Sequence, residues 1–274
     1  MKKLYAFILF LALSSSVRAQ NDSIQLVDIK YNYVVRGNDT RDISYDGFFN
    51  LLLFSDFGVS IYDLATNIDE NNPLLKSDLS VVEWKPKGKN LSTLYKDYAN
   101  NQVFLKDIIN FKFFVQKDSL NIFNWKIKDA TKNILGYQCQ LATTTFRGRN
   151  YEAWFTAALP VCGPWKFDDL PGAILAVKAV DNYVSWEAKG IVISKKSPDI
   201  IKPTNPFVLN KALTWSEFKL LYKEKAIAIS KYKTEDGEPS TSVTPRMGTE
   251  RYIEEDDNDY QADKVMKKIM NKNK

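Results

Sequence analysis

Residues 154–177 read WFTAALPVCGPWKFDDLPGAILAV, and this stretch organises the rest of the chain. A strand-like run ends at Pro160, a Cys-Gly-Pro-Trp loop follows, and a second loop leads into the apolar run 173–177. Gly-Pro and Pro-Gly steps restrict the backbone on both sides of Trp165 and Phe167. Because two large aromatic side chains are unfavourable in a mobile loop, we predict that residues 161–172, called the insert below, pack rigidly on a β-sheet.

Strand-like segments surround the insert. Residues 24–35 alternate between apolar and polar positions and are rich in β-branched and aromatic residues, which indicates a strand. Segments 134–145 and 151–156 flank the glycine-containing connection 146–150 and predict a β-hairpin. Further candidates recur about every ten residues, as in an antiparallel meander: 59–62, 80–84, 102–105, 111–115, 122–127, 173–180 and 190–194. The fold class expected is mainly β, a single antiparallel curved sheet or partial barrel with one C-terminal amphipathic helix and a disordered tail.

The predicted helix covers residues 214–230. Thr214 and Glu217 have the spacing of a capping box, and apolar residues recur after them at helical intervals. Three prolines between residues 195 and 210 favour an extended linker before it. Residues 234–274 are polar and charged, with acidic residues at 254–259 and a lysine-rich end, and we expect this tail to be disordered.

The N-terminus has the pattern of an export signal. Lys2 and Lys3 precede the apolar run 4–13, and Val17-Arg18-Ala19 is a small-x-small cleavage site. We expect a signal peptide over residues 1–19, cleavage between Ala19 and Gln20, and a β-rich domain over residues 20–233. The apolar run of about ten residues is half of what a membrane span needs. The mature protein is therefore expected in the periplasm or outside the cell, and not as an integral membrane protein.

Composition removes several classes of function. The formal net charge is +5, and removal of Lys2, Lys3 and Arg18 with the signal peptide leaves 5 − 3 = +2. This small, interspersed charge does not predict nucleic-acid binding. The chain contains no histidine, which excludes a Ser-His-Asp triad, a Cys-His dyad and histidine-containing zinc sites. We predict no cofactor and no metal site.

Carboxylates are the remaining candidates for catalysis. Asp168 and Asp169 lie in the insert, and Glu152 lies on the second hairpin strand. A hydrolase would need two of these groups to converge in a cleft, and adjacent residues need not point together. Turn formation or capping is the other interpretation of the aspartates.

Two further pairs of residues allow alternatives. Cys139 and Cys162 are an even pair in an exported chain, which favours a disulfide that ties the insert to the hairpin. Closing a loop with 22 intervening residues would stabilise the fold by about 3 kcal/mol. Two buried free thiols are the alternative. Arg147 and Arg149 at the hairpin tip are either solvated or in contact with an anion or a partner.

The hairpin and insert also carry a family resemblance. Five linked motifs occur in the order ILGYQC at 134–139, FRGR at 146–149, AWF at 153–155, GPWKF at 163–167 and DLPGAI at 169–174. In this order they resemble the GLPGLI family of exported Bacteroidota proteins, over residues 120–180 and by layout elsewhere. Asp169 and Ala173 depart from the family's signature Gly-Leu-Pro-Gly-Leu-Ile. The resemblance implies an exported β-rich protein and does not imply an activity.

The sequence therefore predicts a non-catalytic binding or interaction protein of the cell envelope, with a carboxylate-dependent hydrolase as the alternative. A concave sheet with 13% aromatic residues could hold an apolar ligand, or the protein could present its insert to an envelope protein. The expected binding residues in the insert are Trp165, Phe167, Asp168, Asp169, Leu170, Pro171 and Gly172, with Arg147 and Arg149 beside them.

Overall fold

The computed structural model describes residues 24–36, 43–64, 94–109, 112–196, 202–230 and 249–250. In this part of the chain, twelve strands form one open sheet in the order β12-β6-β5-β4-β3-β2-β1-β11-β10-β9-β8-β7. The strands are β1 Ile24–Arg36, β2 Ile43–Phe54, β3 Val59–Leu64, β4 Leu94–Asp97, β5 Gln102–Ile109, β6 Lys112–Ser119, β7 Lys126–Ile134, β8 Tyr137–Phe146, β9 Arg149–Thr156, β10 Ala173–Ala179, β11 Val184–Lys196 and β12 Ala212–Thr214. The helix α1 spans Trp215–Ser230, and the described residues also contain 3-10 turns at Ser55–Phe57 and Leu209–Lys211.

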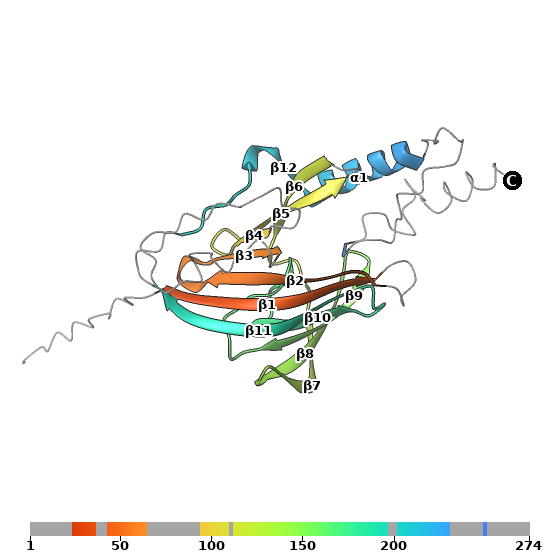
Figure 1. Cartoon of the computed structure of the whole chain (residues 1–274). Helices are drawn as coiled ribbons and strands as arrows, with labels where there is room; N and C mark the ends of the chain where they lie inside the picture. Colours follow the sequence, from red (N-terminus) through yellow and green to blue (C-terminus); the bar gives the residue numbers. More distant parts are fainter. Residues whose placement is uncertain are drawn as a thin grey trace, which may run out of the picture.

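The sheet is antiparallel except at β12, which pairs in parallel with β6. Figure 1 shows it winding from β12 and β6, beside α1, through the long strands β2, β1 and β11 to β8 and β7. The predicted fold class, a mainly antiparallel curved sheet with one C-terminal helix, is confirmed.

One ion pair shows how strongly the sheet curves. Eight strands separate β6 from β8 in the sheet order, so a flat sheet would hold these strands about 43 Å apart at about 4.8 Å per step. Arg147, in the turn after β8, nevertheless forms a 2.6 Å ion pair with Asp118 of β6. The curvature therefore brings distant strands to one place, which lies at the site described below.

Apolar side chains are buried on both faces of the central strands. Val27 and Ile29 of β1 belong to the larger apolar cluster, which contains the insert, whereas Ile24 and Leu26 belong to a second cluster. In β2, Leu51 and Leu53 face the larger cluster, and Leu52 and Phe54 face the second one. Partly buried residues that include Val115 and Phe207 pack against the second cluster. On the other face of these strands, Phe167 and Leu170 of the insert belong to the larger cluster.

Tight turns join the strands of the predicted hairpin. Arg147 and Gly148 have φ values of 43° and 80°, as a two-residue type I′ turn requires. Leu135 and Gly136, with φ values of 50° and 85°, make an equivalent turn between β7 and β8. The predicted connection 146–150 is thus too long, because Phe146 and Arg149 already pair in the ladder.

Several predicted elements differ from the structure. The segment 122–127 is mostly not a strand, because β7 begins only at Lys126; Phe123 and Trp125 instead pack as irregular chain against the larger cluster. Strands β2, β4 and β12 and most of β7 were not predicted, and β11 begins at Val184, six residues before the predicted segment 190–194. The predicted helix 214–230 is confirmed within one residue, and the capping box forms, with Glu217 accepting hydrogen bonds from the Thr214 backbone and hydroxyl.

Some predictions concern residues outside the described ranges. These are the signal peptide 1–19 with its Ala19–Gln20 cleavage site, the strand 80–84 and the tail 234–274 apart from Thr249 and Glu250. Among the described residues, no helix combines the length and the apolar character that a membrane span requires.

Candidate functional site

The insert, residues 161–172, lies inside the curved sheet and not on its surface. Phe167 is fully buried, and its ring contacts Tyr151, Trp186 and Trp165 at centroid distances of 4.9, 5.2 and 5.3 Å. Asp168, Leu170 and Gly172 are also buried, Trp165 and Asp169 are half-buried, and Pro171 is exposed. The insert therefore occupies the concavity in which we expected an apolar ligand. Its aromatic side chains belong to the core and are not presented to a partner.

Backbone geometry fixes the end of the insert. Gly172 has a φ of 136°, and a Cβ atom there would lie 2.0 Å from the carbonyl oxygen of Thr156. Only glycine fits this close approach between the insert and the end of β9. Asp169 also adopts a positive φ, 71°. Aspartate tolerates this region better than most residues, so the turn forms without glycine at this position.

A buried lysine holds the insert to the sheet. Lys96 of β4 is fully buried, and its Nζ atom donates to the carbonyl oxygens of Gly163 and Phe167 at 2.9 and 2.8 Å. The same ammonium forms a 2.8 Å ion pair with Asp168, which also accepts a 3.0 Å hydrogen bond from the Tyr98 hydroxyl. Trp125 donates from Nε1 to the carbonyl oxygen of Asp168 at 2.7 Å. All three ammonium protons of Lys96 therefore have acceptors.

The predicted disulfide is absent, and the alternative of two buried free thiols is what the structure shows. The sheet gives the reason. Cys162 bridges to Ala173 on one side of β10, Ala173 pairs with Thr156 of β9 on the other side, and Cys139 lies one strand further, on β8. Three strand-to-strand steps of about 4.8 Å exceed the separation of at most about 7 Å that a disulfide allows between Cα atoms. Burial raises the pKa of Cys162 to about 12, so its thiol is unreactive.

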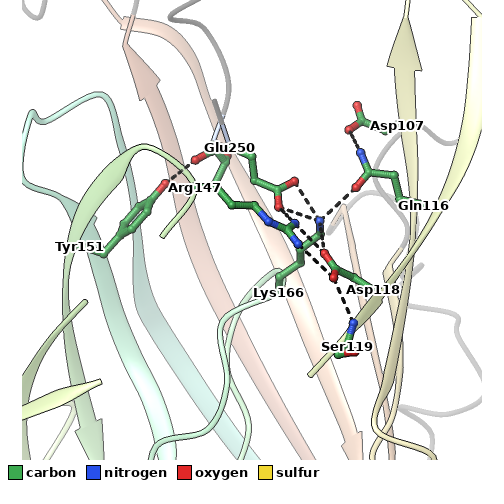
Figure 2. Close-up of polar contacts among 9 residues, drawn as sticks. Asp107, Gln116, Asp118, Ser119, Arg147, Tyr151, Lys166 and Glu250 are labelled. Carbon is green, nitrogen blue, oxygen red and sulfur yellow. Dashed lines mark hydrogen bonds and ion pairs between the residues drawn. The ribbon is translucent and has the colours of Figure 1, made fainter. Parts of the chain in front are cut away.

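A second buried lysine, Lys166, lies at the centre of an ionic cluster (Figure 2). Its Nζ atom lies 2.8 and 2.9 Å from the two carboxylate oxygens of Glu250, and 3.1 Å from both Asp118 and the Gln116 side-chain oxygen. Arg147 binds both oxygens of Asp118 and also pairs with Glu250. Lys166 and Glu250 are almost completely buried. These two cations and two carboxylates sum to zero charge, which makes their joint burial tolerable.

The electrostatics of Asp118 reflect this cluster. Burial alone would raise the pKa of the Asp118 carboxyl, but the Lys166 ammonium and the Arg147 guanidinium together outweigh burial and lower the pKa below its usual value. Asp118 is therefore held as a carboxylate whose oxygens both accept hydrogen bonds from Arg147. A carboxylate with both oxygens bound by Arg147 is suited to holding its neighbours in position and not to transferring a proton.

Both hairpin arginines have partners within the chain. Arg149 is buried, forms an ion pair with Asp181 and stacks over the ring of Tyr183 at 4.1 Å. The guanidinium of Arg147 lies 4.8 Å from the Phe146 ring and 4.4 Å from the Trp215 ring. Neither arginine is at a solvated tip, so that interpretation was wrong. Arg147 instead connects the ionic cluster to Trp215, the first residue of α1.

An open groove of about 800 Å³ adjoins this cluster. Its walls come from the turn between β4 and β5, the end of β6, the turn between β8 and β9, and the start of α1. The residues in its walls are mainly polar: Asn100, Asn101, Gln102, Lys117, Asp118, Ser119, Arg147, Thr214, Trp215, Ser216 and Lys219. None of the insert residues expected to bind a ligand is among them; of the predicted site residues, only Arg147 is.

The predicted catalytic carboxylates do not converge. Asp168 is engaged by Lys96 and Tyr98 in the interior. Glu152 is exposed on β9, between the buried residues Tyr151 and Ala153, and thus points to the other face of the sheet. Burial and the charge of Asp168 raise the pKa of Asp169, and one Asp169 carboxylate oxygen has no hydrogen-bond partner among the described residues. No group of three or more cysteine, aspartate or glutamate side chains in the described ranges is arranged to hold a metal ion.

Comparison with known proteins gives limited similarity. A family model described as "N-glycanase peptide, N-terminal domain" matches residues 92–215. No curated protein matches the chain. A structure of PNGF-II in the P21 space group is similar with 16% sequence identity and a TM-score of 0.47, over 74% of this chain and 34% of that one. A structure of PNGF-II in the C2 space group gives 17% identity and a TM-score of 0.44, over 73% of this chain and 32% of that one. The chain thus spans about one third of the length of these proteins.

Proposed function

We propose that this protein is a non-catalytic binding module and that the polar groove between the β4–β5 turn, β6 and α1 is its binding site. The proposed ligand is a hydroxyl-rich molecule of the glycan class. The observation that carries the proposal is the lining of the groove: three side-chain amides, three hydroxyl groups and a tryptophan surround an open volume of about 800 Å³. This volume lies within the usual range for small-ligand sites.

The chemistry of the lining matches that of a saccharide. Sugar hydroxyl groups both donate and accept hydrogen bonds, and amide side chains can answer both needs. Gln102 and Ser216 form no hydrogen bonds with their side chains among the described residues, so these groups can turn to a ligand. The indole of Trp215 adds an apolar edge for the carbon skeleton of a sugar ring, and the Arg147 stacking interaction holds it in place.

The match to the N-terminal domain model supports the same ligand class. The matched residues, 92–215, include the parts of β5, β6 and the β8–β9 turn that line the groove. The model's description refers to an N-glycanase, and we extend only the ligand class to this chain. The acidic side chain in the groove lining is Asp118, and Arg147 and Lys166 already bind its carboxylate. This favours binding over hydrolysis.

We further propose that the protein acts outside the cytoplasm, as a member of the GLPGLI family. The export pattern at residues 1–19 and the five linked motifs at 134–174 support this. The mass of the mature protein, isolated from its own cell envelope, tests the proposal. A protein that begins at Gln20 is the expected result, and a retained Met1 would contradict it.

A glycan array with the folded, signal-free protein tests the binding function, followed by calorimetric titration of the saccharides that bind. Gln102→Ala should weaken binding about 3- to 10-fold, the effect of one lost neutral hydrogen bond. Gln138→Ala is the matched control, because Gln138 is exposed on β8 and is not part of the groove. Absence of any bound saccharide, with folding verified by circular dichroism, would refute the function. Equal effects of the two variants would refute the location.

A further inference from the structure

The pocket around Glu250 is built like a ligand site, and its occupant is a segment of the chain itself. Thr249 and Glu250 lie beyond α1 in the sequence, and residues 231–248 separate them from the helix. The Glu250 side chain is 0% exposed and lies between Lys166 and Arg147 (Figure 2). The two residues therefore contact the sheet as a peptide ligand does, at the end of a long covalent connection.

The contacts to this segment are of two kinds, and both suit peptide recognition. The Tyr151 hydroxyl donates to the backbone carbonyl oxygen of Thr249, a group that any residue supplies. Burial raises the pKa of Tyr151, so the hydroxyl keeps the proton that it donates. The Glu250 carboxylate accepts from Lys166 at 2.8 and 2.9 Å and pairs with Arg147. Peptide-binding sites combine such contacts, because backbone hydrogen bonds give affinity and side-chain pockets give specificity.

Lys166 has further contacts that hold it in position without Glu250. Its Nζ atom donates to Gln116 and to Asp118 of β6 at 3.1 Å each. The Gln116 amide in turn donates to Asp107 at 2.9 Å, which directs the side-chain oxygen of Gln116 toward the lysine. An ammonium group has three protons, so one proton of Lys166 is directed at the occupant of the pocket.

Charge makes the pocket selective for an anion. Lys166 and Arg147 contribute two positive charges and Asp118 one negative charge, so these three groups sum to 2 − 1 = +1 before Glu250 is counted. Because Lys166 is 0% exposed, a neutral occupant would leave a positive charge uncompensated in the interior. A carboxylate is therefore the group that the pocket requires, whichever chain carries it.

We propose that Lys166, Arg147 and Tyr151 form a peptide-binding site whose ligand is a segment of another chain with a glutamate side chain. Lys166 and Arg147 bind the glutamate, and Tyr151 binds the carbonyl group that precedes it. Thr249 and Glu250 occupy this site in cis until such a segment displaces them. A covalently connected occupant has an effective concentration on the order of 1 mM, so it excludes weak ligands. This site and its ligand are independent of the glycan proposed for the groove.

Calorimetric titration of the Glu250→Ala variant tests this site, with a capped peptide of residues 247–252 (MGTERY) as the ligand. The substitution empties the carboxylate pocket and retains the rest of the chain. The peptide should bind, and a peptide with glutamine at the glutamate position should bind 10-fold or more weakly, because it lacks the charge. The protein with Glu250 in place should bind the glutamate peptide 10-fold or more weakly than Glu250→Ala does, because its own glutamate competes.

Second substitutions in the Glu250→Ala background connect binding to the pocket. Lys166→Met should remove the preference for glutamate over glutamine. Tyr151→Phe should weaken both peptides by the same factor, about 3- to 10-fold, because it removes one hydrogen bond to the backbone. Lys178→Met is the control, because Lys178 is exposed on β10 and makes no contact with Glu250.

A refolding measurement covers the case in which Glu250→Ala does not fold alone. The glutamate peptide should then raise the yield of folded protein on dilution from urea, and the glutamine peptide should not, because a ligand stabilises the state that binds it.

Three results would overturn the site. Equal effects of the glutamate and glutamine peptides would mean that no carboxylate is recognised. Equal affinity of the glutamate peptide for the proteins with and without Glu250 would mean that it binds elsewhere. No effect of the glutamate peptide on Glu250→Ala, in titration or in refolding, would mean that Glu250 is only a structural counter-ion of Lys166.

Discussion

Removal of the Lys96 side-chain charge should destabilise the insert more than any exposed substitution. In Lys96→Met the apolar stem is retained, but the ammonium that binds Asp168 and the carbonyl oxygens of Gly163 and Phe167 is lost. Asp168 then lacks its counter-charge in a buried position, and the Tyr98 hydroxyl is its other side-chain donor. An uncompensated buried charge is costly, so the variant loses far more than a surface ion pair would.

The magnitude follows from the burial of both partners. Lys96 is 0% exposed and Asp168 2% exposed, which places the pair among buried ion pairs, where loss of one partner costs about 3–5 kcal/mol. Asp168→Asn should cost about as much, because it leaves the ammonium without its counter-charge. The double variant Lys96→Met/Asp168→Asn removes both charges, so its cost should be smaller than the sum of the single costs by about 2–3 kcal/mol.

Equilibrium unfolding in urea, followed by tryptophan fluorescence, measures these free energies, since Trp165 and Trp186 both pack around the insert. Lys178→Met is the matched control, because it makes the same substitution at an exposed position of β10. A second measurement uses the thiol of Cys162, which is buried within the insert. In a Cys139→Ala background, Lys96→Met should speed the reaction of this thiol with a disulfide reagent, because the insert opens more often.

Two results would refute the reasoning. If the loss of unfolding free energy in the double variant equals the sum of the losses in the single variants, Lys96 and Asp168 are not coupled. A loss below about 1 kcal/mol in Lys96→Met, with Cys162 still protected, would mean that aromatic packing alone holds the insert. Should Lys96→Met fail to fold, comparison of the double variant with Asp168→Asn remains decisive, because the coupling reduces the further cost of Lys96→Met in that background to about 1–2 kcal/mol.

Three further predictions concern other charged positions. Glu250→Gln should destabilise the fold by about 3 kcal/mol in urea unfolding, because Lys166 and Arg147 then share Asp118 as their carboxylate and the buried cluster keeps a net positive charge; an unchanged midpoint would contradict the docking of Glu250. Asp169→Asn should raise the melting temperature at neutral pH, with a gain of about 1 kcal/mol, because asparagine tolerates the positive φ, keeps an acceptor oxygen for the backbone N–H groups of Ile122 and Phe123 and removes a half-buried charge; a lower melting temperature would refute this. Burial raises the pKa of Asp28 from 3.8 to about 6, so stability is lost as the pH rises from about 4 to about 6, and the buried carboxylate weakens the fold at higher pH. Asp28→Asn should therefore be neutral near pH 4 and stabilising by about 1–2 kcal/mol near pH 8, and the same gain at both values would contradict the titration.

The success of the strand predictions depended on which faces of a strand are covered. In β1 the alternation of apolar and polar residues was visible, and the strand was predicted within one residue. In β2 the run Leu51-Leu52-Leu53-Phe54 shows no alternation, because both faces of this central strand are buried by different apolar clusters. The same run is equally compatible with a buried helix, so periodicity could not identify it.

The site was harder to predict because its residues meet only through curvature and register. The sequence predicted that the insert packs rigidly on the sheet, and in the structure its residues Phe167 and Leu170 are buried in the larger apolar cluster. It gave no sign that Lys166 would be buried or that Glu250, 84 residues away, would be its partner. The cysteine pair was misinterpreted for the same reason, since an even count and an export signal contain no information on how many strands separate two residues.

The position of the groove depends on contacts that extend from its wall into the interior. Glu250 neutralises Lys166, Lys166 and Arg147 share Asp118, and Arg147 in turn stacks on Trp215 at the wall of the groove. The ion pairs in this series lie in a buried environment with few alternative partners. Breaking one of them therefore leaves an unpaired charge on the group it joined. A surface groove on a curved open sheet would otherwise be free to widen as the sheet flexes. The ionic cluster connects β6, the β8–β9 turn and α1 at this point of the open sheet, so the groove is preorganised, and preorganisation lowers the free-energy cost of binding a ligand.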